Sequence, residues 1–481
     1  MTTRRNFMLG MAATVGLPSW AKGGETSLRL GVLSDLHIHA DSVGTSAVQT
    51  AFRLFREKGV DGVVICGDLA EAGLVSEMES LAKCWFGVFP DDIGGDGKKV
   101  KRLFIYGNHD HEGWKYCNRA KRDSDGKLIP ADGCLINDYV GSWERIWGET
   151  WKPVRMEEVN GYRIVLQHFD GWGGVNPAVK FLQEHLAELA GDRPFFYVQH
   201  VHPKNTCAGS EEGDGQIRTA LNAFPNAIAL TGHSHCPNWL EGSFWHGEFV
   251  SVECGCAKFT ITEDGRENSF PCPRKGSLTP RLDTHDGICA EYLTLDGGEL
   301  RIERWDLSSV EQVGAPWCAP LPLRPVEGSE ENPARWPFKA PLVAPQFAPG
   351  AMGKAEQTAD GKKVIVSFPS AASGRAHDYR VTVVVDGKNV LERRVFAPHY
   401  YRAPSVPRGL CKCVFAQDEL PGGNVSFELR PVAENGCEGG LLRIDTVVRK
   451  EKLGRLGTDP AERAFYGAFC GSSPLNDLGI G

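Results

Sequence analysis

The sequence predicts an α/β domain followed by a smaller all-β domain. Three observations predict this order. Short apolar runs alternate with helical patterns over the first 230 residues, which is typical of an α/β sheet. Residues 311–350 contain nine prolines and little periodic pattern. Beyond them, short strand-like runs separated by turns indicate a small β-sandwich.

The first 21 residues predict an export signal. Residues 3–7 (TRRNF) lead into an apolar stretch of about 14 residues, which is shorter than the ~20 needed to span a bilayer. The stretch ends in residues 19–21 (SWA), a small-x-small cleavage pattern. The twin arginines resemble bacterial signals that export folded proteins. We therefore expect a periplasmic or secreted protein without a membrane span.

Composition and charge narrow the function classes. The chain has 481 residues, of which 41% are hydrophobic and 24% charged, and this excludes a largely disordered chain. Its net charge is −8, so a broad basic face and a stable nucleic-acid partner are not expected. The 15 cysteines are read either as buried small hydrophobic residues or as members of long-range disulfides.

The elements of the α/β domain follow in order along residues 28–310. Strands are expected in the apolar runs at 27–33, 62–66, 103–106, 162–166, 195–198 and 227–230. Helical spacing is found at 45–58, 74–89 and 177–189. A hairpin over 288–307 with an Asp-Gly-Gly turn is expected to close the domain.

The remaining chain divides into three parts. Residues 311–345 are predicted to be a proline-rich linker, and residues 346–450 a β-sandwich-like domain. Its strands are expected at 364–368, 379–385, 390–396, 425–429 and 441–448. Residues 451–481 are expected to be a weakly ordered tail.

Residue types that bind metals follow five of the apolar runs. Ligands in open α/β sheets bind beyond the carboxyl ends of the strands, so we expect these side chains to meet at one rim. They are, in chain order, Asp35 and His37; Asp68; Asn108, His109 and Asp110; His200 and His202; and His233 and His235.

These five blocks resemble the pattern of the calcineurin-like metallophosphoesterase family. That pattern is D-x-H, G-D, G-N-H-[DE], a lone His and G-H-x-H, and all five are present in this order over residues 35–235. The resemblance implies a core of two sheets in an α/β sandwich. It also implies hydrolysis of a phosphate mono- or diester in a small phosphorylated substrate. Segments at 202–207, 265–269 and 317–322 resemble exported bacterial members with a C-terminal β-domain.

The resemblance also implies a centre of two divalent or mixed-valence transition-metal ions. One ion would take Asp35, His37 and His235, the other Asn108, His200 and His233, and Asp68 would bridge them. Nitrogen and oxygen ligands suit Mn, Fe or Zn. A metal-bridging hydroxide would attack the phosphate, His109 would act as general acid, and Asp110 would hold its ring. Glu71 occupies the position of an iron-binding Tyr in some members, which argues against a tyrosinate-iron site.

Several alternatives stay open at this point. Either His200 or His202 fills the lone-His block, although His200 directly follows the apolar run. His39, His111 and His168 either line the substrate pocket or are solvated loop residues. A non-catalytic metal-containing surface or glycan-binding protein and a 5′-nucleotidase-like enzyme are the alternative functions. Loops 111–160 and 203–217 are expected to decide between monoester and diester, and the oligomeric state cannot be read.

Overall fold

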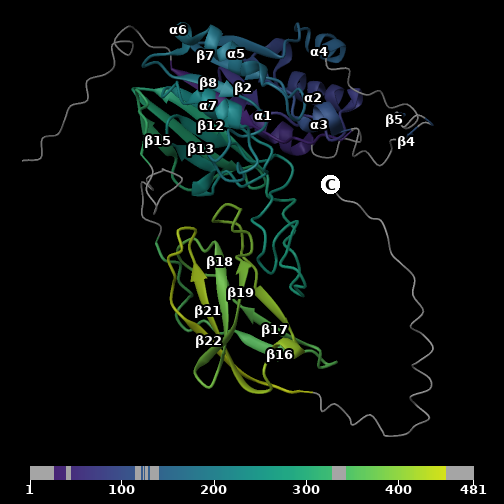
Figure 1. Ribbon diagram of the computed structural model, residues 1–481, viewed down its shortest axis with the longest axis vertical. Helices are drawn as coiled ribbons and strands as arrows, with labels where there is room; N and C mark the ends of the chain where they lie inside the picture. The colour runs from purple at the N-terminus through teal and green to yellow at the C-terminus, as the bar shows by residue number, and fades with distance from the viewer. Residues whose placement is uncertain are drawn as a thin grey trace, which may run out of the picture.

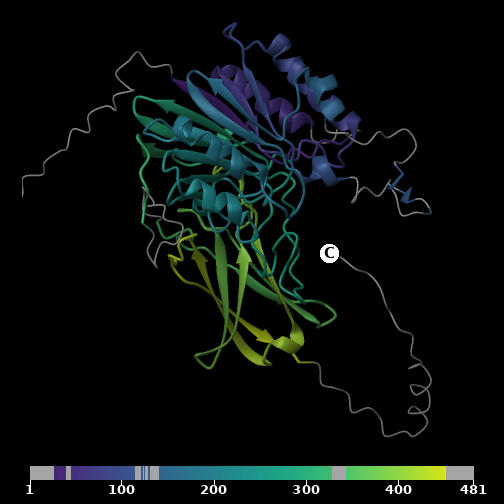
Figure 2. The same ribbon diagram turned by 45° about the horizontal axis from the view of Figure 1, so that its top comes forward.

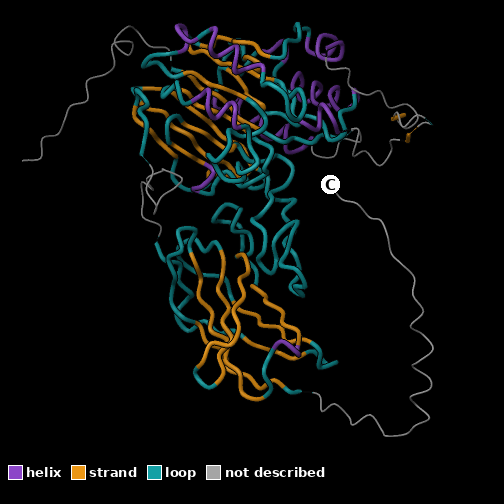
Figure 3. Tube along the Cα trace, in the orientation of Figure 1, coloured by secondary structure: helices purple, strands orange, loops and turns teal. Residues whose placement is uncertain are grey.

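The computed structural model shows a layered core with a β-rich region beneath it (Figures 1 and 2). Figure 3 separates helices, strands and loops in the same orientation as Figure 1. The predicted signal (1–21) and tail (451–481) lie outside the described residues. The structure describes residues 27–39, 45–113, 121–122, 124, 128–129, 140–327 and 343–450.

The first core sheet has a parallel centre and an antiparallel edge. Its strands are β1 (Leu28–Leu33), β2 (Gly62–Ile65), β3 (Lys101–Phe104), β12 (Cys289–Asp296), β13 (Glu299–Asp306), β14 (Glu311–Gln312) and β15 (Trp317–Pro320). Their order is β14-β13-β12-β1-β2-β3, with β15 also paired to β13. Strands β1, β2 and β3 are parallel, whereas β12 runs antiparallel to β1.

The second core sheet has six strands and a similar parallel centre. They are β6 (Val154–Val159), β7 (Tyr162–Gln167), β8 (Phe195–Val198), β9 (Ala227–Thr231), β10 (Phe244–His246) and β11 (Val250–Glu253). The order is β10-β11-β9-β8-β7-β6, and the four inner strands from β11 to β7 are parallel. Strands β8 and β9 are buried along their whole length, as expected for apolar runs covered on both faces.

Helices cover the outer faces of the two sheets. The helices are α1 (Thr45–Lys58), α2 (Val75–Val88), α3 (Asn108–Glu112), α4 (Val140–Trp147), α5 (Pro177–Glu184), α6 (Leu186–Leu189) and α7 (Gly215–Leu221), with short 3₁₀ turns at Pro90–Asp92, Glu241–Ser243 and Gln417–Glu419. One apolar cluster joins residues of both sheets, such as Val32 and Leu166. Separate clusters pack α1 and α2 on the first sheet and α5 and α7 on the second.

The C-terminal region is built from two small antiparallel sheets. One contains β16 (Lys354–Gln357), β17 (Lys363–Phe368) and β20 (Cys411–Ala416), in that order. The other has the order β19-β18-β21-β22, with bounds Lys388–Phe396, Asp378–Val385, Gly423–Val432 and Leu442–Val448. A two-stranded ribbon elsewhere joins β4 (Lys121–Arg122) to β5 (Leu128–Ile129). The architecture confirms the predicted α/β core followed by all-β sheets.

The two parts of the molecule share a packed interface. Trp239 and Val313 of the core belong to the apolar cluster of the C-terminal sheets. Arg402 donates to the buried Asp306 carboxylate at 2.8 Å. Asn268 accepts a hydrogen bond from the Phe396 backbone at 2.7 Å. The β-rich region is therefore anchored to the core by both apolar and polar contacts.

The structure differs from the prediction within the proline-rich segment 311–345. Strand β15 pairs with β13, and its Trp317 is buried against Phe244 of the second sheet, with ring centroids 5.4 Å apart. The prolines did not prevent pairing because Pro316 and Pro320 lie just before the strand and at its end, where a proline is tolerated. The first part of the segment therefore completes the core.

Two further predictions, on membrane spans and on the cysteines, can be compared with the described residues. Among the described residues, no helix has the length and apolar character needed to cross a membrane. The cysteines in the described ranges are free thiols, most of them buried. This agrees with the first reading of the cysteines, as small buried residues.

Candidate metal centre

The parallel strands deliver the five motif loops to one rim. Leu33 pairs with Ile65, and Ile65 pairs with Phe104, so β1, β2 and β3 end level with one another. In the second sheet, Val198 of β8 pairs with Leu230 of β9. Loops that leave level strand ends start side by side, which brings residues far apart in sequence into contact.

The backbone at this rim is strained. Asp35, His37, Asp68, His233 and His235 adopt φ angles of 53°, 43°, 51°, 74° and 53°. Residues other than glycine rarely adopt this left-handed conformation, and its cost is tolerated mainly where function requires it. The strain therefore coincides with the residues that the sequence singled out.

Two glycines allow the loops to approach so closely. A Cβ atom on Gly232 would lie 1.7 Å from Ser34 Oγ and 2.3 Å from Asp35 Oδ2. A Cβ atom on Gly107 would lie 2.2 Å from Asp68 Oδ1. Any side chain at these positions would displace a carboxylate of the rim.

The first half of the site contains Asp35, His37 and His235. His235 Nε2 lies 3.1 Å from Asp35 Oδ1 and 3.1 Å from His37 Nε2. All three residues are buried. Two ligand atoms that each lie ~2.1 Å from one ion are about 3–3.5 Å apart, so these separations suit a shared ion.

The second half contains Asn108, His200 and His233. Asn108 Oδ1 lies 2.9 Å from His200 Nε2 and 3.0 Å from His233 Nδ1. Asp68 lies between the halves, with Oδ2 3.2 Å from His200 Nε2 and 3.6 Å from His37 Nε2. The geometry thus brings together the seven residues that the resemblance implied.

The donor set fits metal ions. Groups of ligand atoms within 4.8 Å of one another include Asp35 with His37 and His235, and Asp35 with Asp68 and His200. The buried Oδ1 of Asp35 has no hydrogen-bond partner. A buried, unpartnered carboxylate oxygen is costly unless a cation or donor satisfies it. Asp35, His37, Asp68, His200 and His235 could therefore bind metals.

Outer contacts orient two of these histidines. His37 Nδ1 lies 3.1 Å from Glu71 Oε2, and His200 Nδ1 donates to the Cys66 carbonyl at 2.8 Å. Metal-binding histidines commonly donate their other ring nitrogen in this way, which fixes the tautomer. In the sequence, Glu71 stands only where some family members have an iron-binding tyrosine. Its contact with His37 is not predicted from the sequence.

The electrostatics are those of a cation site. Burial would raise the pKa of Asp35, but His235 and His200 hold it well below its ordinary value. Burial would lower the pKa of His37, but Asp35 and Glu71 raise it to about 10. Burial likewise opposes the effect of Asp68 and Asp35, which raise the pKa of His200 to about 9. Metal binding would displace these protons, because a ligating imidazole is neutral.

His109 lies at the edge of this cluster. Its Nδ1 donates to the Glu71 carbonyl at 2.7 Å, which fixes the orientation of the ring. Its backbone N–H donates to Asp68 Oδ1 at 2.8 Å. The ring stands edge-on to His37, with centroids 4.5 Å apart. A side-chain nitrogen of His109 also lies within ligand reach of His37 and Asp68.

Asp110 has a different role from the one predicted. It is buried and accepts hydrogen bonds from the backbone N–H groups of Leu69, Ala70 and Gly107 at 3.0, 2.8 and 2.7 Å. The ring of His109 is oriented by the Glu71 carbonyl instead. Asp110 therefore ties the loop after β3 to the loop after β2, because a buried carboxylate beside three N–H groups satisfies all of them.

The structure separates His200 from its alternative, His202. His202 Nε2 lies 3.0 Å from Glu253 Oε2, and its Nδ1 lies 2.6 Å from Thr231 Oγ1. It is buried beneath the rim, and its ring nitrogens contact residues outside the ligand set. Of the two alternatives, His200 is thus the one that lies beside Asn108 and Asp68.

The three remaining histidines have separate surroundings. His168 is buried between the Tyr106 backbone N–H at 3.0 Å and the Arg155 guanidinium at 2.8 Å. Burial and Arg155 lower the pKa of His168 well below its ordinary value, so the ring is neutral. His111 packs edge-on against Phe169. His39 is partly exposed, with Nε2 3.9 Å from Glu71 Oε2.

Residues 28–237 match the family model described as calcineurin-like phosphoesterase. No curated protein sequence matches the chain.

Three solved structures illustrate the likeness of the fold. Purple acid phosphatase from yellow lupin (Lupinus luteus) is 15% identical, with a TM-score of 0.37; the match covers 62% of this chain and 54% of the lupin chain, about half its length. A dimetal phosphatase from Danio rerio is 10% identical, with a TM-score of 0.32, over 61% of this chain and 98% of that one. A predicted phosphoesterase from Streptococcus pneumoniae is 12% identical, with a TM-score of 0.27, over 61% and 98%.

The likeness to the family lies in residues 28–237. Those residues contain all five motif blocks, from Asp35 to His235. Residues 28–237 form a calcineurin-like phosphoesterase domain.

Proposed function

We propose that the protein is an exported two-metal-dependent phosphoesterase that hydrolyses a phosphate mono- or diester. The observation that carries the proposal is the position of Asp68 between two clusters of three ligands, 3.6 Å from His37 Nε2 and 3.2 Å from His200 Nε2. When bound, two metal ions would supply activated water and would neutralise the charge of the phosphate. Mn, Fe and Zn suit the nitrogen and oxygen donors.

The residues of the chain have distinct roles in this proposal. Asp35, His37 and His235 hold one ion, Asn108, His200 and His233 hold the other, and Asp68 contacts both. His109 is the general acid, and its Nε2 delivers a proton to the leaving oxygen. Water oxygen forms the new P–O bond, the P–O bond to the leaving group breaks, and the products are an alcohol and a phosphate.

The experiment combines metal analysis with a simple assay. Purified protein loaded with Mn²⁺, Fe²⁺ or Zn²⁺ is tested on 4-nitrophenyl phosphate and bis(4-nitrophenyl) phosphate. Close to two ions per chain and metal-dependent release of nitrophenol are expected. One ion or none, or two ions without hydrolysis of either ester, would contradict the proposal.

The export route is proposed from residues 3–7 alone, which lie outside the described ranges. Replacing Arg4 and Arg5 by Lys is expected to leave the protein in the cytoplasm, because the twin-arginine route reads this pair. Cell fractionation of the bacterial host measures the effect. Unchanged export of the variant would indicate the general secretory route instead.

A further inference from the structure

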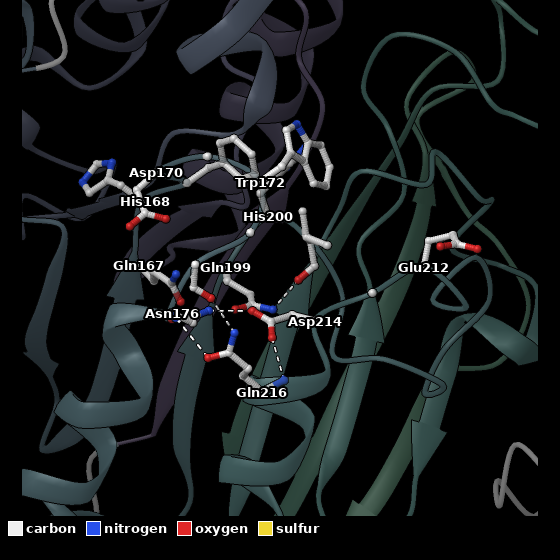
Figure 4. Close-up of a pocket in the computed structure, with 16 residues that line it drawn as sticks. Gln167, His168, Asp170, Trp172, Asn176, Gln199, His200, Glu212, Asp214 and Gln216 are labelled. Carbon is white, nitrogen blue, oxygen red and sulfur yellow. Dashed lines mark hydrogen bonds between the residues drawn. The ribbon is translucent and has the colours of Figure 1, made fainter. Parts of the chain in front are cut away.

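A cavity of about 240 Å³ opens beside the second half of the metal centre (Figure 4). His200 lines this cavity, and the Nε2 atom of His200 lies 2.9 Å from Asn108 Oδ1. Trp172 also lines it, with its ring centroid 5.5 Å from that of His233. A phosphate held at the metal centre would therefore project its ester group toward this cavity.

Four carboxamides line the cavity: Gln167, Asn176, Gln199 and Gln216. Neighbouring groups fix their positions. The Tyr197 hydroxyl contacts Oε1 of both Gln167 and Gln199. Gln216 donates to the Gly174 carbonyl at 2.7 Å. An amide nitrogen has two hydrogens and an amide oxygen two lone pairs, so amides held by one contact at each atom still have a donor and an acceptor for hydroxyl groups, which also donate and accept.

The charges around the cavity exclude an anionic occupant. Its lining contains Asp170, Glu212 and Asp214 but neither Lys nor Arg among the described residues. A second phosphate or a carboxylate there would meet like charges with no Lys or Arg in the described lining to offset them, which disfavours it. The part of the substrate that enters the cavity therefore carries no negative charge.

The same carboxylates do not form a cation site. Asp214 already accepts hydrogen bonds from the backbone of Gln216 and Ile217 and from Asn176 Nδ2. Asp170 and Glu212 are exposed to solvent. No carboxylate of this lining is both buried and unpaired, as a bound ammonium group would require.

Trp172 adds an apolar platform. It is 56% exposed and lies between Gly171 and Gly173, whose φ angles are 120° and 85°. Its other neighbour is Phe169, at a centroid distance of 5.1 Å. An indole face and fixed amides that line the same cavity suit a ring that has hydroxyls on its edge and C–H groups on its face.

We propose that this cavity holds the leaving group of the phosphoester and selects an uncharged, hydroxyl-rich group, as in a sugar or polyol phosphate. The inference rests on the proposed phosphoesterase function. The volume of this cavity, about 240 Å³, lies below the ~300–1,000 Å³ of pockets for drug-sized ligands, which suits a small group such as a single ring.

The first test compares esters that share a phosphate and differ in leaving group. Metal-loaded protein is assayed on fructose 1-phosphate, fructose 1,6-bisphosphate, phosphocholine and methyl phosphate. We expect kcat/KM for fructose 1-phosphate to exceed those for the bisphosphate and phosphocholine by at least about tenfold. A preference for the bisphosphate, or for phosphocholine, would overturn the proposed class of leaving group.

The second test uses variants of the lining. Trp172→Ala is expected to raise KM for fructose 1-phosphate about tenfold, with a smaller change for methyl phosphate, which has no ring to stack. Asp170→Lys is expected to reduce the difference in kcat/KM between fructose 1-phosphate and fructose 1,6-bisphosphate. Val175→Ala is the matched control, because Val175 lies on the same loop, is 81% exposed and does not line the cavity.

The outcomes separate this inference from the function on which it rests. Equal effects of Trp172→Ala on fructose 1-phosphate and methyl phosphate would mean that the cavity does not hold the leaving group. Absence of hydrolysis of 4-nitrophenyl phosphate by protein that contains two ions would instead overturn the phosphoesterase function itself.

Discussion

Buried carboxylates differ in backbone conformation and in hydrogen-bond partners between the two parts of the molecule. Asp35 at the metal centre and Asp378 in the C-terminal sheets both have fully buried side chains. Asp35 adopts a left-handed backbone, and its Oδ1 has no hydrogen-bond partner. Asp378 lies in the regular strand β18, and Arg394 donates to both of its oxygens at 2.7 Å.

The difference indicates what each part is built for. A buried carboxylate oxygen that faces several histidine ring nitrogens without a hydrogen bond, on a strained backbone, suits a cation from outside the chain. A carboxylate with two charge-assisted hydrogen bonds is already complete. The core rim is therefore prepared for cations, whereas the C-terminal sheets have the features of a stabilising module. The predictions below test this contrast.

Replacing the shared carboxylate should have the largest effect. Asp68→Asn removes a charge that faces both His37 and His200. We expect weaker binding of both ions and a fall in turnover of at least ~10³-fold on every ester, since metal ions stabilise the transition state by several kcal/mol. Elemental analysis and kinetics measure the two effects. Asp378→Asn is the control, and its turnover per bound ion should equal that of the wild type.

His109→Asn should separate chemistry from metal binding. A lost general acid costs ~10²–10⁴-fold in rate, while the seven ligand residues stay in place. Alkyl phosphates should be affected most, because their leaving oxygen needs a proton, and 4-nitrophenyl phosphate least. Loss of metal in step with activity would instead identify His109 as a ligand, a role that its reach to His37 and Asp68 also permits.

Part of the site and part of the C-terminal sheets could be predicted from the sequence. Each ligand follows an apolar run, and parallel strands that end level bring such residues together, so the rim could be predicted from local patterns. His200 is favoured over His202 in the sequence because it directly follows its apolar run, and in the structure it lies 2.9 Å from Asn108 Oδ1. The strands predicted at 379–385 and 390–396 correspond to β18 and β19, which pair with each other.

Other features depend on contacts that no local pattern encodes. Glu71 reaches His37 because the loop after β2 folds back, with Ala70 bridged to Ile38. Asp110 was expected at the ring of His109, but three backbone N–H groups converge on it. Strand β15 was not predicted because its segment is rich in proline. In the structure, its Trp317 is buried between the sheets. Each miss involves a long-range partner.

Gly232→Ala tests the close approach at the rim directly. A methyl group there would overlap Ser34 Oγ and Asp35 Oδ2, so Asp35 must move away from His235. We expect metal binding to weaken about 10–100-fold, as when an orienting contact of a ligand is lost. Gly409→Ala in the C-terminal region is the control, because no atom lies within 4 Å of its added methyl group. Equal metal affinity in both variants would contradict the strained arrangement.

Asp378→Asn should affect stability rather than turnover, with a defined dependence on pH. Burial would raise the pKa of Asp378, but hydrogen bonds from His377 and Arg394 hold it below its ordinary value. A carboxyl with a lowered folded pKa stabilises the protein above its unfolded pKa of ~4, and this contribution disappears as the pH falls through the folded value. At pH 7 we expect the variant to lose about 2 kcal/mol, less than the ~3–5 kcal/mol of a fully buried pair because Arg394 is 42% exposed.

The loss should shrink as the pH falls below ~4, because the carboxyl of the unfolded wild type is protonated there and that of the folded protein follows at its lower pKa, after which both are neutral like the amide. Thermal unfolding of both proteins between pH 3 and 7 measures this convergence, and the metal content at pH 7 should be unchanged. A loss of equal size at every pH would mean that packing of the side chain, and not its charge, stabilises the C-terminal sheets. Loss of metal in the variant would show that the two parts are coupled, and the contrast between a site completed from outside and a module complete in itself would fail.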